Sequence, residues 1–167
     1  MSPSKHPCPR CSAVGRSVGA VTLRGVLKPE ALERLDDLGG FRFCATPGCG
    51  LAYYGSSEQT VELPELRVRV GVKETHDPRP LCYCFDFTAR DIESAVRTHG
   101  VCSIPDEITE KCRAGLDRCE ETNPRGACCL GDVRRCLRVV RDELDLAPAK
   151  TPEGPLPSCC DTAVDDE

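Results

Sequence analysis

The stretches CPRC at residues 8–11 and CATPGC at residues 44–49 decide the fold of the first half of this chain. Each holds two cysteines on a short turn that contains proline or glycine. A structural zinc site takes four tetrahedral thiolates, two from each of two such turns, and backbone N–H groups in the turns offset the negative charge on sulfur. The spacing therefore predicts a closed, structural zinc (Zn²⁺) site with the ligands Cys8, Cys11, Cys44 and Cys49.

Neighbouring residues bear on the same site. Zinc with four thiolates has a net negative charge, so we expect Arg10 or Lys5 to lie close enough to help neutralise it. His6 is an alternative ligand that could replace one cysteine. A simpler alternative is that the four thiols pack as small apolar side chains.

Composition narrows the class of protein. The chain has 167 residues with 14 cysteines, 14 prolines, 14 glycines and no tryptophan, so a large apolar core is not expected and cross-links by metal or disulfide are. The N-terminal sequence MSPSKHPCPRC has no apolar run typical of a signal peptide, and the sequence has no apolar stretch of about 20 residues. We therefore expect a cytoplasmic protein without membrane insertion, whose clustered thiols bind metal. The net charge of −5, with both signs interspersed, argues against a nucleic-acid partner.

A second group of cysteines lies further along the chain. Cys82 and Cys84 form a C-x-C pair, which is uncommon for structural zinc but can hold a [2Fe–2S] cluster, and such a cluster takes four thiolates. The candidates for the other two ligands are Cys119 and the adjacent Cys128 and Cys129. The last two precede a predicted helix, whose N-terminus would present N–H donors to the anionic sulfurs. The choice between Cys128 and Cys129 stays open on this reasoning.

The pattern of apolar residues predicts an α+β chain: a small β-rich zinc-binding module, a small helical [2Fe–2S]-binding module and a disordered C-terminal tail. The breaker HDPRP at 76–80 separates the two modules. The module bounds are 1–76 and 77–146, and the proline-rich, acidic tail covers 147–167. Strands are predicted over 18–27, 41–44, 51–54 and 66–73, and helices over 28–38, 88–100, 106–117 and 129–144.

Taken together, the segments CPRC, FRFCATPGCGLAYY, LRVRVGVKE, RPLCYCFDFTARDI and CEETNPRGACCLGDV resemble the N-terminal portion of the CopZ-type copper chaperones, over roughly residues 7–145. In that family a zinc-binding module precedes a [2Fe–2S] domain related to the bacterioferritin-associated ferredoxins. The resemblance implies zinc at the first four cysteines and the cluster at Cys82, Cys84, Cys119 and Cys129. It also implies reduction of a metal such as Cu(II) to Cu(I), transient Cu⁺ binding, and a partner such as a copper-transporting ATPase, another soft-metal-handling protein or an electron donor.

The sequence departs from the family pattern in two ways. It has no segment that matches the ferredoxin-like copper domain with its C-x2-C loop, and Asp117 stands where the family often has a further cysteine. The vicinal pair Cys159-Cys160 could capture a soft ion or pair redox-actively. Cys112 and Cys136 are expected to be packed thiols.

Three functions follow from these observations. The first is a redox-active, metallochaperone-like accessory protein in copper or other soft-metal homeostasis. The alternatives are a ferredoxin-like electron-transfer protein without metal delivery and a purely structural zinc scaffold. No Ser/His/Asp arrangement, paired catalytic carboxylates or phosphate loop is recognisable, so a turnover enzyme is not expected.

Overall fold

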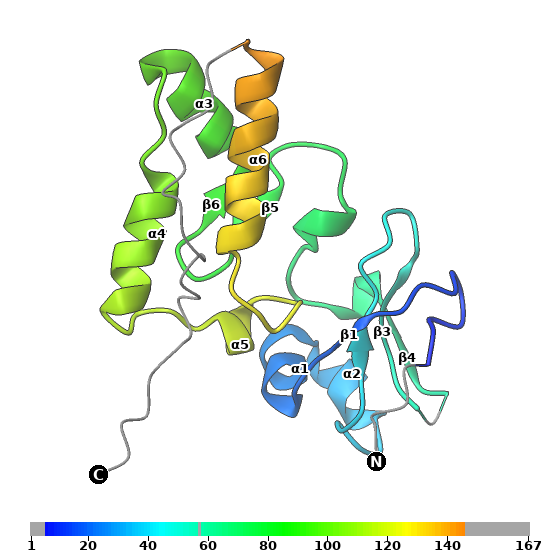
Figure 1. Ribbon diagram of the computed structural model, residues 1–167. Helices are drawn as coiled ribbons and strands as arrows, with labels where there is room; N and C mark the ends of the chain where they lie inside the picture. The colour runs from blue at the N-terminus through cyan, green and yellow to red at the C-terminus, as the bar shows by residue number, and fades with distance from the viewer. Residues whose placement is uncertain (1–5, 57, 146–167) are drawn as a thin grey trace.

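The computed structural model describes residues 6–56 and 58–145, which contain helices and two small sheets (Figure 1). This mixture agrees with the α+β expectation. The first sheet is antiparallel with its strands in chain order. Its strands are β1 (Arg16–Ser17), β2 (Arg42–Phe43), β3 (Leu51–Tyr54) and β4 (Thr60–Glu62). The strands predicted over 41–44 and 51–54 are therefore present as β2 and β3, which pair on either side of the CATPGC turn.

The segment after β1 is helical, and the strand predicted over residues 18–27 is wrong. Helix α1 (Ala20–Val26) buries Leu23 and Val26, which lie at helical spacing, while Val21 is 47% exposed. Val21 and Leu23, two residues apart, form too short a pattern to distinguish the strand period from the helix period. Helix α2 (Pro29–Glu33) lies within the helix predicted over 28–38 but is shorter than that range.

Residues 66–73 do not form the predicted strand. The chain passes through the 3₁₀ turns η1 (Leu63–Glu65) and η2 (Gly71–Lys73), with one isolated bridge between Leu66 and Leu27. The Arg67 backbone N–H donates to the Val26 carbonyl at 2.9 Å, and its guanidinium donates to the Leu27 carbonyl. This segment therefore satisfies the C-terminal end of α1 instead of extending a sheet.

The second half pairs β5 (Pro80–Cys82) with β6 (Phe87–Thr88) and continues into α3 (Ala89–His99), α4 (Ile104–Arg113), α5 (Cys119–Thr122) and α6 (Leu130–Glu143). Helix α3 lies within the range predicted for a helix over 88–100 and begins with a capping box, in which the Asp91 side chain accepts from the Thr88 N–H at 2.7 Å. Gly100 ends it with φ 69°. Helix α6 packs against α3 and α4, whereas the short helix α5 was not predicted.

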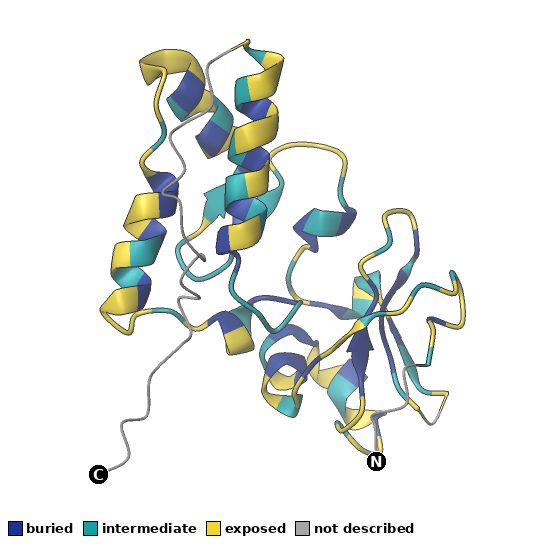
Figure 2. Ribbon diagram, viewed as in Figure 1, coloured by how far each residue is buried: buried dark blue, intermediate teal, exposed yellow. Residues whose placement is uncertain are grey.

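Buried apolar side chains form two main cores, one in each half of the molecule (Figure 2). Leu23, Phe41 and Tyr53 belong to the first core, and Ile92 and Val133 to the second. Full burial of each such side chain contributes about 1.5–3 kcal/mol. The division at residue 76 stays a prediction, because the halves also touch: α5 lies against α1 (Figure 1).

Segment 147–167, with its Cys159-Cys160 pair, lies outside the described residues. None of the helices in the described part of the chain has the length and apolar character needed to cross a membrane.

Candidate metal centres

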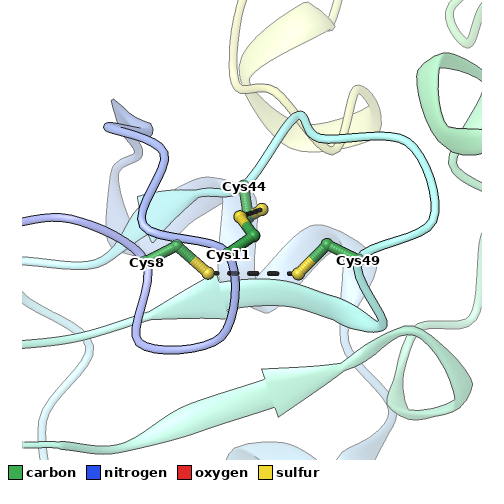
Figure 3. Close-up of side chains that lie close together, drawn as sticks. All are labelled: Cys8, Cys11, Cys44 and Cys49. Atoms are coloured by element: carbon green, nitrogen blue, oxygen red, sulfur yellow. Dashed lines mark hydrogen bonds between the residues drawn. The ribbon is translucent and has the colours of Figure 1, made fainter.

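The four cysteines of the first group come together at one end of the four-stranded sheet (Figure 3). Their sulfur atoms all lie within 4.8 Å of one another. The Sγ atoms of Cys8 and Cys49 are 4.0 Å apart, and those of Cys11 and Cys44 are 3.6 Å apart. A Zn–S bond of about 2.3 Å places tetrahedral ligand sulfurs about 3.8 Å apart. The spacing of these sulfurs therefore matches a single tetrahedral ion.

The turns around this site direct backbone N–H groups at sulfur, as the sequence predicted. The N–H groups of Arg10 and Cys11 bond Cys8, and the Leu51 N–H bonds Cys49. The Ala13 N–H bonds Cys11. Such donors stabilise thiolates over thiols.

The two thiols of the CPRC turn differ in acidity. Burial raises the pKa of Cys8 to about 11, because its side chain is almost fully enclosed. The Thr46 hydroxyl lies 3.3 Å from the Cys11 sulfur, and its hydrogen bond lowers the pKa of Cys11 to about 6. Cys11 is thus the thiol best prepared to be a thiolate.

Two cations lie beside these cysteines. Lys73 is buried, and its Nζ donates to the carbonyls of Thr46 at 3.0 Å and Cys49 at 2.8 Å. Sequence reasoning missed Lys73, because the wrong strand over 66–73 placed it on a solvent-facing position. Arg10 pairs with Glu62, and its guanidinium lies over Gly50, where a Cβ would meet Nη1 at 2.6 Å.

Lys5 and His6 were the other two residues that the sequence suggested near this site. Lys5 lies outside the described residues. His6 packs edge-on against the Tyr54 ring, with centroids 5.7 Å apart, and it is not part of the four-sulfur group. The first group therefore provides four sulfur ligands, and His6 is not needed as a ligand.

The second group of cysteines is gathered from three places in the chain. Cys82 and Cys84 lie at the turn between β5 and β6, Cys119 begins α5, and Cys129 is the N-cap of α6. The sulfurs of Cys84 and Cys119 are 3.4 Å apart. Hydrogen bonds from the thiols of Cys129 and Cys84 lower the pKa of Cys119 to about 3, and a hydrogen bond with Cys129 also lowers that of Cys82.

These contacts form an open series, from Cys82 to Cys129 to Cys119 to Cys84. Among residues 6–56 and 58–145, only the first group has its four sulfurs all within 4.8 Å of one another. The second group is therefore more extended than a single tetrahedral ion requires.

Backbone N–H groups also serve the second group. The Arg118 N–H donates to the Cys84 sulfur at 3.2 Å, and the Cys129 N–H bonds Cys119. Of the adjacent cysteines, Cys129 is the one whose thiol bonds Cys82 and Cys119, and it is 1% exposed. This geometry favours Cys129 over Cys128 as a ligand. Cys112 and Cys136 lie in the second apolar core, as expected of packed thiols.

Comparison with known proteins bears on the first centre. A family model described as a zinc binding domain, zf_CopZ, matches residues 5–67. Most of the first half of the chain is therefore similar to a zinc-binding domain of the CopZ type. The matched range contains all four cysteines of the tetrahedral group.

One CopZ protein, compared as a sequence and as the solved structure of its N-terminal domain, extends the similarity into the second half. The chain is 36% identical over 130 residues to the copper chaperone CopZ of Archaeoglobus fulgidus, an alignment that covers 77% of this chain and 60% of that protein. The chain thus spans about three-fifths of the relative's length. The X-ray structure of the Archaeoglobus fulgidus CopZ N-terminal domain matches with a TM-score of 0.59 and 28% identity, over 85% of this chain and 99% of that one.

Proposed function

We propose that this chain is a zinc- and [2Fe–2S]-binding, redox-active accessory protein in copper or other soft-metal homeostasis. The observation that carries the proposal is the presence of two cysteine groups with different shapes. One is a compact tetrahedron of sulfurs, and the other is an open series of four. Two different metal groups would explain this difference.

The first group fits zinc. Its donor set is four sulfurs, its edges of 3.6 and 4.0 Å are those of a tetrahedron, and backbone N–H groups surround it. We assign Cys8, Cys11, Cys44 and Cys49 as the ligands. Four protein ligands leave no open position for a substrate, so this site holds the fold together.

The second group fits a [2Fe–2S] cluster. The cluster takes four thiolates, and Cys82, Cys84, Cys119 and Cys129 provide them. When bound, such a cluster supplies one-electron transfer. The chain's own residues prepare the place: backbone N–H groups bond three of the sulfurs, and only Cys84 of the four is part-exposed. Electrons would then enter or leave on the side of Cys84.

Copper is proposed as cargo or substrate on the basis of similarity to a copper chaperone. The soft sulfur chemistry of the chain is compatible with Cu(I). The partner would be a copper-transporting ATPase, another soft-metal-handling protein or an electron donor. In this role the chain handles electrons and metal and does not turn over an organic substrate.

The decisive experiment is anaerobic purification followed by reconstitution with ferrous iron and sulfide. We expect about two irons, two sulfides and one zinc per chain, and an EPR signal of one unpaired electron after dithionite reduction. Cys129→Ser should lose the iron but keep the zinc. Cys136→Ala, which removes another buried thiol of the same core, should keep both.

The other candidate functions give different results in the same material. Zinc without iron or sulfide, even after reconstitution, would refute the cluster and leave a structural zinc scaffold. A loaded cluster without stoichiometric Cu(I) binding in a subsequent titration would favour a ferredoxin-like electron carrier.

A further inference from the structure

The segment 119–129, which carries two thiols of the second group, rests on the zinc-binding half. Helix α5 packs against α1 so closely that a Cβ on Gly25 would lie 1.9 Å from the Glu121 carbonyl oxygen. Further along, Gly126 approaches Thr22, where a Cβ would lie 2.7 Å from Oγ1. The position of this segment is therefore set by the first half of the chain.

A tyrosine hydroxyl fixes the middle of this segment. Tyr53, in β3, is fully buried and donates a hydrogen bond of 2.6 Å from its hydroxyl to the Pro124 carbonyl. The neighbouring Asn123 is 2% exposed, and its amide donates to the Ala127 carbonyl at 2.7 Å while accepting from the Arg125 N–H at 3.0 Å. The turn is thus internally rigid, and Tyr53 attaches it to the sheet.

A second tyrosine hydroxyl attaches the C-x-C pair to the first half of the chain. Tyr83, which separates Cys82 from Cys84, donates from its hydroxyl to the Arg69 carbonyl at 2.7 Å and accepts from the Gly71 N–H at 3.0 Å. Residues 69–71 lead directly to Lys73, whose amine bonds the Cys44–Cys49 turn. Each pair of thiols in the second group is therefore attached to the first half by one tyrosine.

The attachment continues to the first group of cysteines. Strand β3 begins two residues after Cys49, and the Cys44 N–H donates to the Ala52 carbonyl at 2.9 Å. The tyrosine that bonds Pro124 thus lies in the strand that the first four cysteines hold in place.

We propose that Tyr53 and Tyr83 are positioning residues for the second metal centre, and that their hydroxyls set the spacing between its two pairs of thiols. Tyr53 places Cys119 and Cys129, and Tyr83 places Cys82 and Cys84. The inference rests on the proposed function, because it concerns how the second group of thiols holds its cluster. It adds a reason for joining the two centres in one chain: the zinc-binding half is the template on which the second centre is built.

The test uses the chain's three tyrosines, each changed to phenylalanine in the full chain. Tyr54→Phe is the matched control, because the Tyr54 hydroxyl bonds the Gly15 N–H at 2.7 Å and otherwise contacts only the first half. Wild type and variants are first loaded with stoichiometric zinc and freed of excess zinc, and are then reconstituted with ferrous iron and sulfide. Zinc content and far-UV circular dichroism establish that each variant is folded.

The readouts are the rate of iron release to a chelator, the EPR g-values and the reduction potential, since general loss of stability would not change the last two in a folded protein. We expect Tyr53→Phe and Tyr83→Phe to release iron on the order of tenfold faster, with shifted g-values and potential, because each leaves a buried backbone group without its partner. Tyr54→Phe should match wild type. The two hydroxyls are removed in separate variants. If one variant does not fold, the other still tests the inference.

Wild-type release rates and spectra in both variants would overturn the inference while leaving the proposed function intact. An equal effect of Tyr54→Phe at full zinc content would also overturn it, because the effect would then not depend on contact with the second half. A wild-type chain that takes up no iron or sulfide would refute the proposed function and the inference with it.

Discussion

Replacement of Gly25 by alanine gives the sharpest test of how the two halves meet. In an ordinary helix interior this change stabilises by about 1 kcal/mol, because alanine loses less backbone entropy than glycine. In α1 the new Cβ would lie 1.9 Å from the Glu121 carbonyl oxygen and 2.8 Å from its carbon, whereas real Cβ atoms essentially never approach within 3.0 Å. A Cβ is fixed by the backbone of its own residue and here meets backbone atoms of Glu121, so no side chain can rotate away.

The structure therefore predicts the opposite sign. Overpacking of a close contact costs about 1–3 kcal/mol, and a contact between a Cβ and a backbone that cannot rotate away belongs at the upper end of that range. After the gain in helix propensity, we expect Gly25→Ala to lower the free energy of unfolding by about 2 kcal/mol. We also expect faster loss of iron from the reconstituted chain, since α5 begins with Cys119.

The assay is urea unfolding of the zinc-loaded protein, with Gly131→Ala as the matched control. Gly131 lies in α6, and a Cβ there would meet no other atom within 4 Å. That variant should be more stable than wild type by about 0.5 kcal/mol. If Gly25→Ala is stabilised to the same degree, then α1 and α5 do not pack as described, and the reasoning about the junction is refuted.

Three further outcomes follow from the sites. Lys73→Met should weaken zinc binding by about tenfold in a competition assay, because it removes the buried cation that bonds the Cys44–Cys49 turn. Lys28→Met, at an exposed position, should leave zinc affinity unchanged. Equal zinc affinities of the two variants would contradict the role of Lys73. Cys129→Ala should abolish iron uptake while Cys128→Ala retains it, and the reverse result would move the ligand by one residue. Asn123→Ala should destabilise the chain by about 1–3 kcal/mol in urea unfolding, since it removes two hydrogen bonds inside the buried turn, and an unchanged midpoint would argue against that turn.

The features that the sequence predicted well depend on local signals. The ends of the helix predicted over 88–100 depend on the neighbouring Thr88, Asp91 and Gly100, and each paired-cysteine turn is specified within a few residues. The grouping of the first four sulfurs followed from their spacing alone. These predictions needed no knowledge of what lies across the chain.

The features that the sequence did not predict depend on distant partners. Helix α1 has only two turns, and its buried face exists because the sheet and α5 cover it. Residues 66–73 alternate like a strand, yet Arg67 donates to the end of α1 and Lys73 to a carbonyl of its own 3₁₀ turn. The role of Lys73 depends on carbonyls more than twenty residues earlier in the chain. No pattern within a short window contains such information.

The packing of residues 119–129 against α1 and β3 has a consequence for the order in which the protein folds and acquires its metals. During synthesis the N-terminal part of a protein leaves the ribosome first and tends to fold first. Residues 8–62, which hold the four sulfurs of the first centre and the surface beneath α5, are complete well before Cys119 is made. We therefore expect metal loading to follow the direction of translation, with zinc acquired by the nascent chain and iron only after release, when the second pair of thiols reaches a surface that already exists.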